Sequence, residues 1–112
     1  MSESSRKVNA QTAAYAAGLG WTLEKMEYYD AFQARTKDWL GFVDFIAKTP
    51  EGEFVAIQST SDATGGNSGA RVRKIKSPKI WPKAMWWLGP NHRIEVWAWK
   101  RDDLKRIPVT AE

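Results

Sequence analysis

Hydrophobic and polar residues alternate or cluster along the 112-residue chain in patterns that predict strands in its middle and near its C-terminal end. Residues 42–48 and 54–60 are rich in Val, Ile and Phe, and a Pro-Glu-Gly-Glu turn separates them. This arrangement predicts a β-hairpin, and its nearly continuous hydrophobic character favours a sheet covered on both faces. Residues 93–100 alternate in the strand period, with Ile94, Val96 and Ala98 on one side, which predicts a further strand.

Helices are predicted before the hairpin and between the hairpin and the last of these strands. An Ala-rich segment, residues 8–17, precedes Gly18, a residue that commonly ends helices. A basic segment, residues 70–76, forms a second helix, and residues 82–88 form a third that begins with Pro82.

The remaining segments have weaker patterns. They are predicted as a disordered tail (1–7), a first strand (21–29), an irregular connection or single helical turn (30–40), a polar glycine-rich loop (61–69) and a short terminal helix (102–107). A crossover helix between the third and fourth strands makes that pair parallel, whereas the hairpin is antiparallel. The sequence therefore predicts a single α/β domain, residues 8–112, around a mixed sheet.

Composition excludes several classes of protein. The chain has no Cys, so it contains neither disulfides nor a thiolate metal site. It lacks an apolar run of the roughly 20 residues that a membrane helix needs. The N-terminus has no apolar signal-peptide segment. We expect a cytoplasmic protein that makes no membrane contact.

Positive charge is concentrated in one segment. The net charge is only +4, but no acidic residue lies between Asp62 and Glu95. The cations of this segment are Arg71, Arg73, Lys74, Lys76, Lys79, Lys83 and Arg93. Such clustering is typical of proteins that bind a phosphate backbone, and Arg71 and Lys74 share one helix face. The alternative is an ordinary solvated helix surface.

Candidate chemistry lies in the hairpin. Asp44 is surrounded by apolar residues, where a carboxylate is costly unless it is paired or metal-bound. Gln58 and Thr60 end the next strand and point to the same side, because strand side chains alternate. These three residues are therefore candidates for one site. The alternative for Asp44 is a structural role, at a turn or in an ion pair with Arg35 or Lys37.

The element order and three short motifs together resemble the PD-(D/E)XK nuclease superfamily, which has the restriction-endonuclease-like fold. The motifs are GFVDFIA (41–47), VAIQSTS (55–61) and the basic segment from Asn67 to Lys74. The likeness covers about residues 8–100 and is strongest to Holliday junction resolvases and related small phage or prophage proteins. It implies an α-β-β-β-α-β core, DNA as partner, and a bacterial or phage-infected host cell.

The resemblance also implies a magnesium site. In the family, an Asp and the Glu of a Glu-X-Lys motif bind Mg²⁺, and the Lys assists the attacking water. Asp44 matches the Asp, whereas Gln58 and Thr60 stand at the Glu and Lys positions. Asp44 and Gln58 alone would hold Mg²⁺ or Mn²⁺ weakly. Glu27 and Asp38 are candidates for a second carboxylate, and Asn9 stands where many members have a helix acid.

Two functions follow as expectations. The first is a Mg²⁺-dependent endonuclease that acts on duplex or branched DNA, with Lys74, or else Lys76, replacing the missing motif lysine. Asn67, Arg71, Arg73, Lys74 and Lys76 would then contact the nucleic acid. The second is a catalytically inactive module of the same fold that binds DNA or protein. Most Trp residues are expected in the core, and an exposed pair would suit a homodimer interface or a stacking platform for bases.

Overall fold

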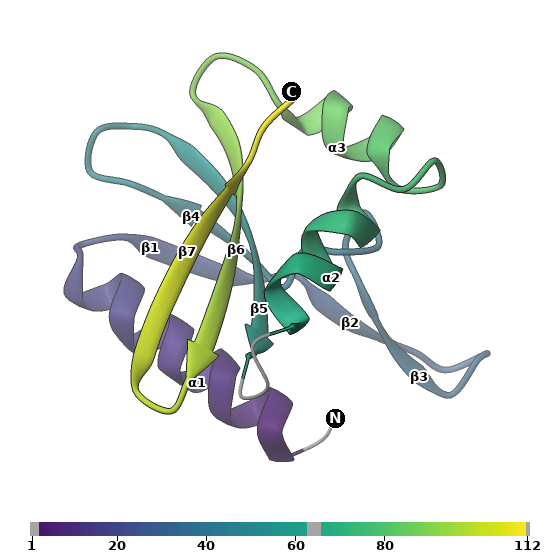
Figure 1. Cartoon of the computed structure of the whole chain (residues 1–112), viewed down its shortest axis with the longest axis horizontal. Helices are drawn as coiled ribbons and strands as arrows, with labels where there is room; N and C mark the ends of the chain where they lie inside the picture. Colours follow the sequence, from purple (N-terminus) through teal and green to yellow (C-terminus); the bar gives the residue numbers. More distant parts are fainter. Residues whose placement is uncertain (1–2, 63–65, 112) are drawn as a thin grey trace.

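The computed structural model describes residues 3–62 and 66–111. In chain order, the elements of these residues are α1 (Glu3–Gly18), β1 (Thr22–Lys25), β2 (Glu27–Asp30), β3 (Arg35–Asp38), β4 (Phe45–Lys48), β5 (Phe54–Ser61), α2 (Asn67–Ile75), α3 (Trp81–Trp87), β6 (His92–Lys100) and β7 (Asp103–Val109). Figure 1 shows them as one unit, with the β2–β3 pair projecting beyond α2.

Five strands form a mixed sheet in the order β1-β4-β5-β6-β7. Strands β4 and β5 pair antiparallel, which confirms the predicted hairpin. Strands β5 and β6 pair parallel across the helical connection, which confirms the predicted crossover. The outer strands β1 and β7 are antiparallel to their neighbours. The chain is therefore an α/β domain around a mixed sheet, as predicted.

Helix α1 covers one face of the sheet (Figure 1). Its buried residues Val8, Thr12 and Ala16 recur every four positions, so they form one stripe along the helix. Ala16 packs in a cluster with Trp97, which is fully buried, and with alternate residues of β4 and β5. This spacing places the N-terminal turns of α1 beside the end of β5.

Helices α2 and α3 contribute to the core on the opposite face. Ile75 and Ala84 are fully buried there against Ala56 of β5 and Val96 of β6. The sheet is thus covered on both faces, which explains the continuous hydrophobic character of its central strands. No helix within the described part of the chain combines the length and hydropathy needed to cross a membrane.

Two predicted elements are wrong, one at each end of the chain. Residues 103–109 form strand β7 and not a terminal helix, because the whole segment pairs antiparallel with β6, and Leu104 packs on one face of the sheet while Ile107 and Val109 pack on the other. Helix α1 begins at Glu3, so residues 3–7 are helical where a disordered tail was predicted; residues 1–2 lie outside the described residues.

Residues 21–40 differ most from the prediction. The single strand predicted at 21–29 is interrupted at Met26, where the chain leaves the main sheet. Strands β2 and β3 then form a separate two-stranded sheet, which we call the ribbon. The ribbon stands where the sequence predicts an irregular connection at 30–40. Each of its strands has only four residues and carries no apolar face, so the sequence shows no strand pattern there.

A buried ion network stabilises the edge formed by β6 and β7. Glu95 accepts hydrogen bonds from Arg93, Arg106 and the indole N–H of Trp97. Burial alone would raise the pKa of Glu95, but the hydrogen bonds from Arg106, Arg93 and Trp97 outweigh it and lower the pKa. The network's stabilisation is therefore present above the ordinary Glu pKa and is lost as the pH falls below it.

We expect Glu95→Ala to lower the free energy of unfolding by about 3 kcal/mol at pH 7, because it leaves two guanidinium groups without their shared counter-ion. Glu53→Ala is the matched control, since it removes a half-exposed partner of Arg93 and should cost less than about 1 kcal/mol. Urea denaturation of both variants checks this. Equal losses would show that the buried network contributes nothing beyond a surface ion pair.

Candidate functional site

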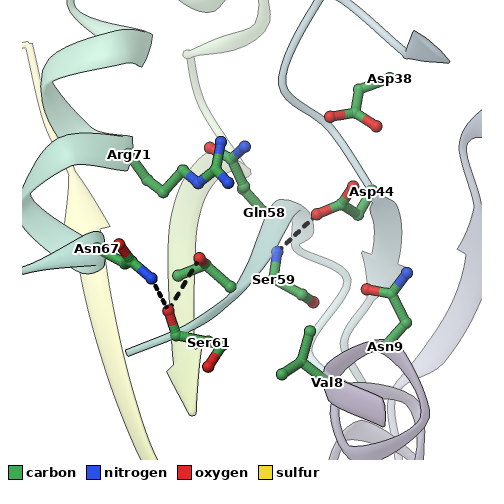
Figure 2. Close-up of a pocket in the computed structure, with 10 residues that line it drawn as sticks. Val8, Asn9, Asp38, Asp44, Gln58, Ser59, Ser61, Asn67 and Arg71 are labelled. Carbon is green, nitrogen blue, oxygen red and sulfur yellow. Dashed lines mark hydrogen bonds between the residues drawn. The ribbon is translucent and has the colours of Figure 1, made fainter. Parts of the chain in front are cut away.

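A polar pocket of about 290 Å³ lies where the second half of β5 meets the N-terminal turns of α1 and α2 (Figure 2). The lining residues are Val8, Asn9, Asp38, Asp44, Gln58, Ser59, Thr60, Ser61, Asn67 and Arg71. Of the predicted catalytic residues, Asp44, Gln58 and Thr60 therefore share one pocket. This placement agrees with the strand alternation from which their convergence was predicted.

The backbone fixes Asp44 on two sides. Its N–H donates to the carbonyl of Ile57, and its carbonyl accepts from the N–H of Met26. The carboxylate accepts a hydrogen bond of 2.7 Å from the Ser59 N–H. Neither Arg35 nor Lys37 pairs with it, because Lys37 binds Asp30 and Arg35 lines a neighbouring cleft. The predicted alternative, a structural ion pair, is therefore wrong.

Two more carboxylates meet Asp44. Glu27 and Asp38 are cross-strand partners at the base of the ribbon. One oxygen of each of Glu27, Asp38 and Asp44 lies within 4.8 Å of the others. Asn9 of α1 donates a hydrogen bond of 2.9 Å to Glu27, which holds that carboxylate toward the cluster. We call these three residues the acidic cluster.

Mutual repulsion and burial change how the acidic cluster binds protons. Burial raises the pKa of Asp44 from 3.8 to about 9, and the negative charge of Asp38 adds to the rise. Burial also raises the pKa of Asp38, although a hydrogen bond to Asp44 and the charges of Lys74 and Arg71 oppose this. Near neutral pH, the cluster therefore holds a proton at Asp44 unless a cation replaces it.

Gln58 lines the same pocket, and its side-chain oxygen is unsatisfied. The residue is only 3% exposed, and its Oε1 has no hydrogen-bond partner among the described residues. Buried side-chain oxygens are nearly always paired, so an unpaired one indicates a missing partner such as water or an ion. Three carboxylates and an amide oxygen are the hard ligands that Mg²⁺ and Mn²⁺ prefer. The residues present therefore fit a divalent cation of that class.

The cations of α2 do not all reach the pocket. Arg71 lines it, and in Figure 2 its side chain extends from α2 toward Gln58. Lys74 lines the cleft on the other side of Asp38. Among the described residues, neither Arg73 nor Lys76 lines the pocket: Arg73 lies over Gly69, and the Lys76 ammonium lies 5.9 Å from the Trp81 ring centroid. Of the predicted cations of α2, Arg71 therefore lines the pocket and Lys74 lines the adjoining cleft, and a catalytic role for Lys74 or Lys76 stays a prediction.

Two polar residues complete the far side of the pocket. Thr60 donates a long hydrogen bond of 3.3 Å to the carbonyl of Ser61. Asn67, at the start of α2, donates to the same carbonyl at 2.6 Å (Figure 2). Asn67 thus lines the pocket, and its amide N–H donates to the protein's own backbone, whereas its predicted contact with nucleic acid stays a prediction. Thr60 supplies a hydroxyl where the resemblance implies an ammonium.

Sequence reasoning placed Asp44 and Gln58 together but left Glu27 and Asp38 as alternatives. The structure brings both to the site, because the two residues pair across the ribbon. A signal for this existed in the polar ends of the segment 27–38, which begins and ends with an acid. The turn between them could not be recognised as a hairpin, so their pairing was not evident.

Comparison with known proteins finds no matching family model, no matching curated protein and no matching solved structure.

Proposed function

We propose that this chain is a divalent-metal-dependent endonuclease that hydrolyses phosphodiester bonds of DNA, with a fold of the PD-(D/E)XK type. One observation carries the proposal: Asp38 and Asp44 of the acidic cluster line a pocket together with Gln58, whose side-chain oxygen is unpaired, and the opposite wall of that pocket carries the cationic Arg71. A site with anionic ligands on one side and a guanidinium on the other suits a metal ion and a phosphate together.

Asp44, Asp38, Glu27 and Gln58 are the residues that would hold the cation. A divalent ion held there lowers the pKa of water and neutralises charge on the phosphodiester. In the hydrolysis, a water oxygen forms a bond to phosphorus and the ester P–O bond breaks, which leaves a phosphate monoester and a hydroxyl group. Without the ion, the raised pKa of Asp44 keeps a proton on the site, so cation binding and proton release are coupled.

Arg71 would orient the phosphate. A guanidinium binds two phosphate oxygens in parallel and stays charged at every physiological pH, so its role is electrostatic and not that of a base. Asn9 acts through Glu27, because its amide N–H holds that carboxylate in place. Asp44 itself is fixed by three backbone hydrogen bonds, so the pocket is formed before any ligand enters.

The fold supports the same proposal. The order α1, β1, β4, β5, α2 and β6 agrees with the core that the resemblance implies, and the ribbon, α3 and β7 are additions to that core. Asp44 and Gln58 occupy the positions that the family uses for its two acidic ligands. The departure is Thr60, which replaces the motif lysine and leaves Arg71 as the pocket's cation.

Cleavage of labelled duplex and branched DNA tests the proposal. We expect hydrolysis with Mg²⁺ or Mn²⁺ and none in EDTA. Asp38→Asn should lower the rate about tenfold, because Glu27 and Asp44, the carboxylate that the backbone fixes, remain to hold the cation. Asp102→Asn, at an exposed turn, is the matched control and should cleave normally. Absence of cleavage with either metal, or equal rates for both variants, would contradict the proposal.

A second function is favoured by one observation, the hydroxyl of Thr60 in the place of the motif lysine. On this reading the chain is a DNA-binding module without catalysis. It predicts binding that weakens as salt rises, that needs no metal, and that is lost on charge reversal of Arg71 and Lys74. DNA affinity that does not change with salt would exclude this role and favour a protein partner.

A further inference from the structure

The ribbon is the most exposed aromatic surface of the described chain. Phe32, in its turn, is fully exposed (102%), Tyr29 is 66% exposed and Tyr28 is 54% exposed. Figure 1 shows the ribbon extending away from the sandwich, beyond α2. Large rings concentrated on a projecting element indicate a binding surface, because isolated exposed aromatics are ordinary but a cluster of them is not.

The turn that carries Phe32 is held in one conformation. The Asp30 carboxylate accepts hydrogen bonds from the backbone N–H groups of Phe32, at 2.9 Å, and Gln33, at 3.3 Å. Lys37 on the opposite strand binds the other oxygen of Asp30 at 2.9 Å. These contacts fix the turn across both strands. The ring of Phe32 is therefore presented to solvent by a preorganised turn.

A cationic cleft lies between the ribbon and the α2–α3 region. It has a volume of about 640 Å³. Its charged lining comprises Arg35, Lys37, Lys74, Lys79 and Lys83, with Asp38 as the single acid. Asp38 lines this cleft and also the polar pocket, so the two cavities adjoin at the acidic cluster. A polyanion lying along the cleft would reach the site of the proposed hydrolysis.

The ribbon joins these features geometrically. Glu27 and Asp38, its basal pair, belong to the acidic cluster, and Tyr29 points to the same face as Glu27 because strand side chains alternate. Tyr28 and Lys37 are partners on the other face, toward the cleft. At about 3.4 Å per residue, the turn lies roughly 10–15 Å from the basal pair. That distance corresponds to a few nucleotides of a strand.

Resting on the proposed function, we propose that the ribbon selects nucleic acid with unpaired bases beside a duplex: phosphates lie in the cationic cleft, and an unpaired base stacks on Phe32 at the turn. Aromatic rings interleaved with cations are how proteins bind single strands, since every base offers a face to stack on. Five cations in the cleft would repel the same cleft of a second copy. A flat membrane surface could not enter it.

Binding of two labelled DNAs without divalent metal tests the inference independently of cleavage. One is a blunt duplex, and the other is the same duplex with two unpaired arms. We expect the wild-type protein to prefer the forked DNA about tenfold by fluorescence anisotropy. Phe32→Ala should remove most of the preference and leave the duplex affinity unchanged, whereas Phe32→Trp should retain it.

Trp86→Ala is the matched control, because this exposed ring lies on α3, outside the lining of both cavities. It should keep the preference. A 2-aminopurine base in one arm should be quenched by the wild-type protein and not by Phe32→Ala. The inference would be overturned if the wild-type protein bound both DNAs with equal affinity, or if Phe32→Ala lost the same affinity for both. Either result would leave the proposed hydrolysis untouched. A sedimentation coefficient that falls in Phe32→Ala would also overturn it, by assigning the ribbon to a second copy of the chain.

Discussion

The variant Asp44→Asn is expected to melt at a higher temperature than the wild-type protein in EDTA near pH 7, yet to lose metal binding and cleavage. Asn has the same shape as Asp and carries no charge, so it fills the same place without the cost of a buried carboxylate. The gain in stability and the loss of function arise from the same residue. A gain in stability together with a loss of function is expected for a residue whose role is to bind a cation.

The pH dependence follows from the shift of the Asp44 pKa, which rises from 3.8 to about 9 on folding. Between these values the folded chain holds a proton that the unfolded chain has lost, so rising pH favours unfolding. The proton's contribution is fully present below pH 3.8 and declines as the pH rises toward 9. In Asp44→Asn this decline is absent. Each pKa unit corresponds to about 1.4 kcal/mol in the free energy of unfolding. Because the folded protein relaxes around the carboxylate, we expect a smaller total loss, about 2 kcal/mol at pH 7.

Thermal melts from pH 4 to pH 9 in EDTA and in Mn²⁺ measure both effects. In Mn²⁺, the wild-type melting temperature should rise, and the rise should grow with pH because binding displaces a proton. Asp44→Asn should show no metal effect and should cleave DNA about 1,000-fold more slowly, since its ligand charge is gone. Asp102→Asn should behave as wild type throughout. A wild-type stability that does not fall relative to Asp44→Asn between pH 4 and pH 7 would disprove the raised pKa.

The central strands and the meeting of Asp44 with Gln58 could be predicted because both depend on local patterns. Strands β4 and β5 are hydrophobic and joined by a recognisable turn, so their pairing fixes which residues adjoin. Alternation then places Gln58 on the side away from α1. Only adjacent strands and a two-residue period are needed to derive this part of the site.

The ribbon could not be predicted, because nothing in its pattern distinguishes a buried face. Its rings point into solvent, and Asp30 fixes its turn through a side-chain contact instead of a glycine turn motif. The sequence predicts a helix where strand β7 lies for a related reason: β7 is an edge strand with mostly exposed residues. In both cases, pairing with a distant strand determines the structure, and composition carries little information about it.

The division of α2 between two cavities was also beyond the sequence. Arg71 and Lys74 are three residues apart and were expected to track one backbone. Asp38 lies between the cavities, so Arg71 lines the pocket and Lys74 the cleft. The roles of the two cations therefore depend on the position of Asp38, a residue of the ribbon.

Arg71→Ala is expected to lower the rate of DNA cleavage about 100-fold, because it removes the only cation that lines the pocket among the described residues. Metal affinity should not fall, since the acidic cluster remains and loses a competing positive charge. Arg71→Lys should recover part of the rate, as an ammonium keeps the charge but not the two parallel hydrogen bonds. Single-turnover cleavage and Mn²⁺ titration measure the two quantities separately.

Arg73→Ala is the matched control, because it removes the same charge from the same helix at a position over Gly69, outside the pocket. It should weaken DNA binding slightly and leave the single-turnover rate unchanged. Lys74→Ala should weaken DNA binding at low salt more than it slows cleavage by the bound complex, because Lys74 lines the cleft in which we propose that the phosphates lie. If Lys74→Ala slows the chemical step and Arg71→Ala does not, the lysine of α2 is the catalytic cation, and the assignment made from the pocket's lining is wrong.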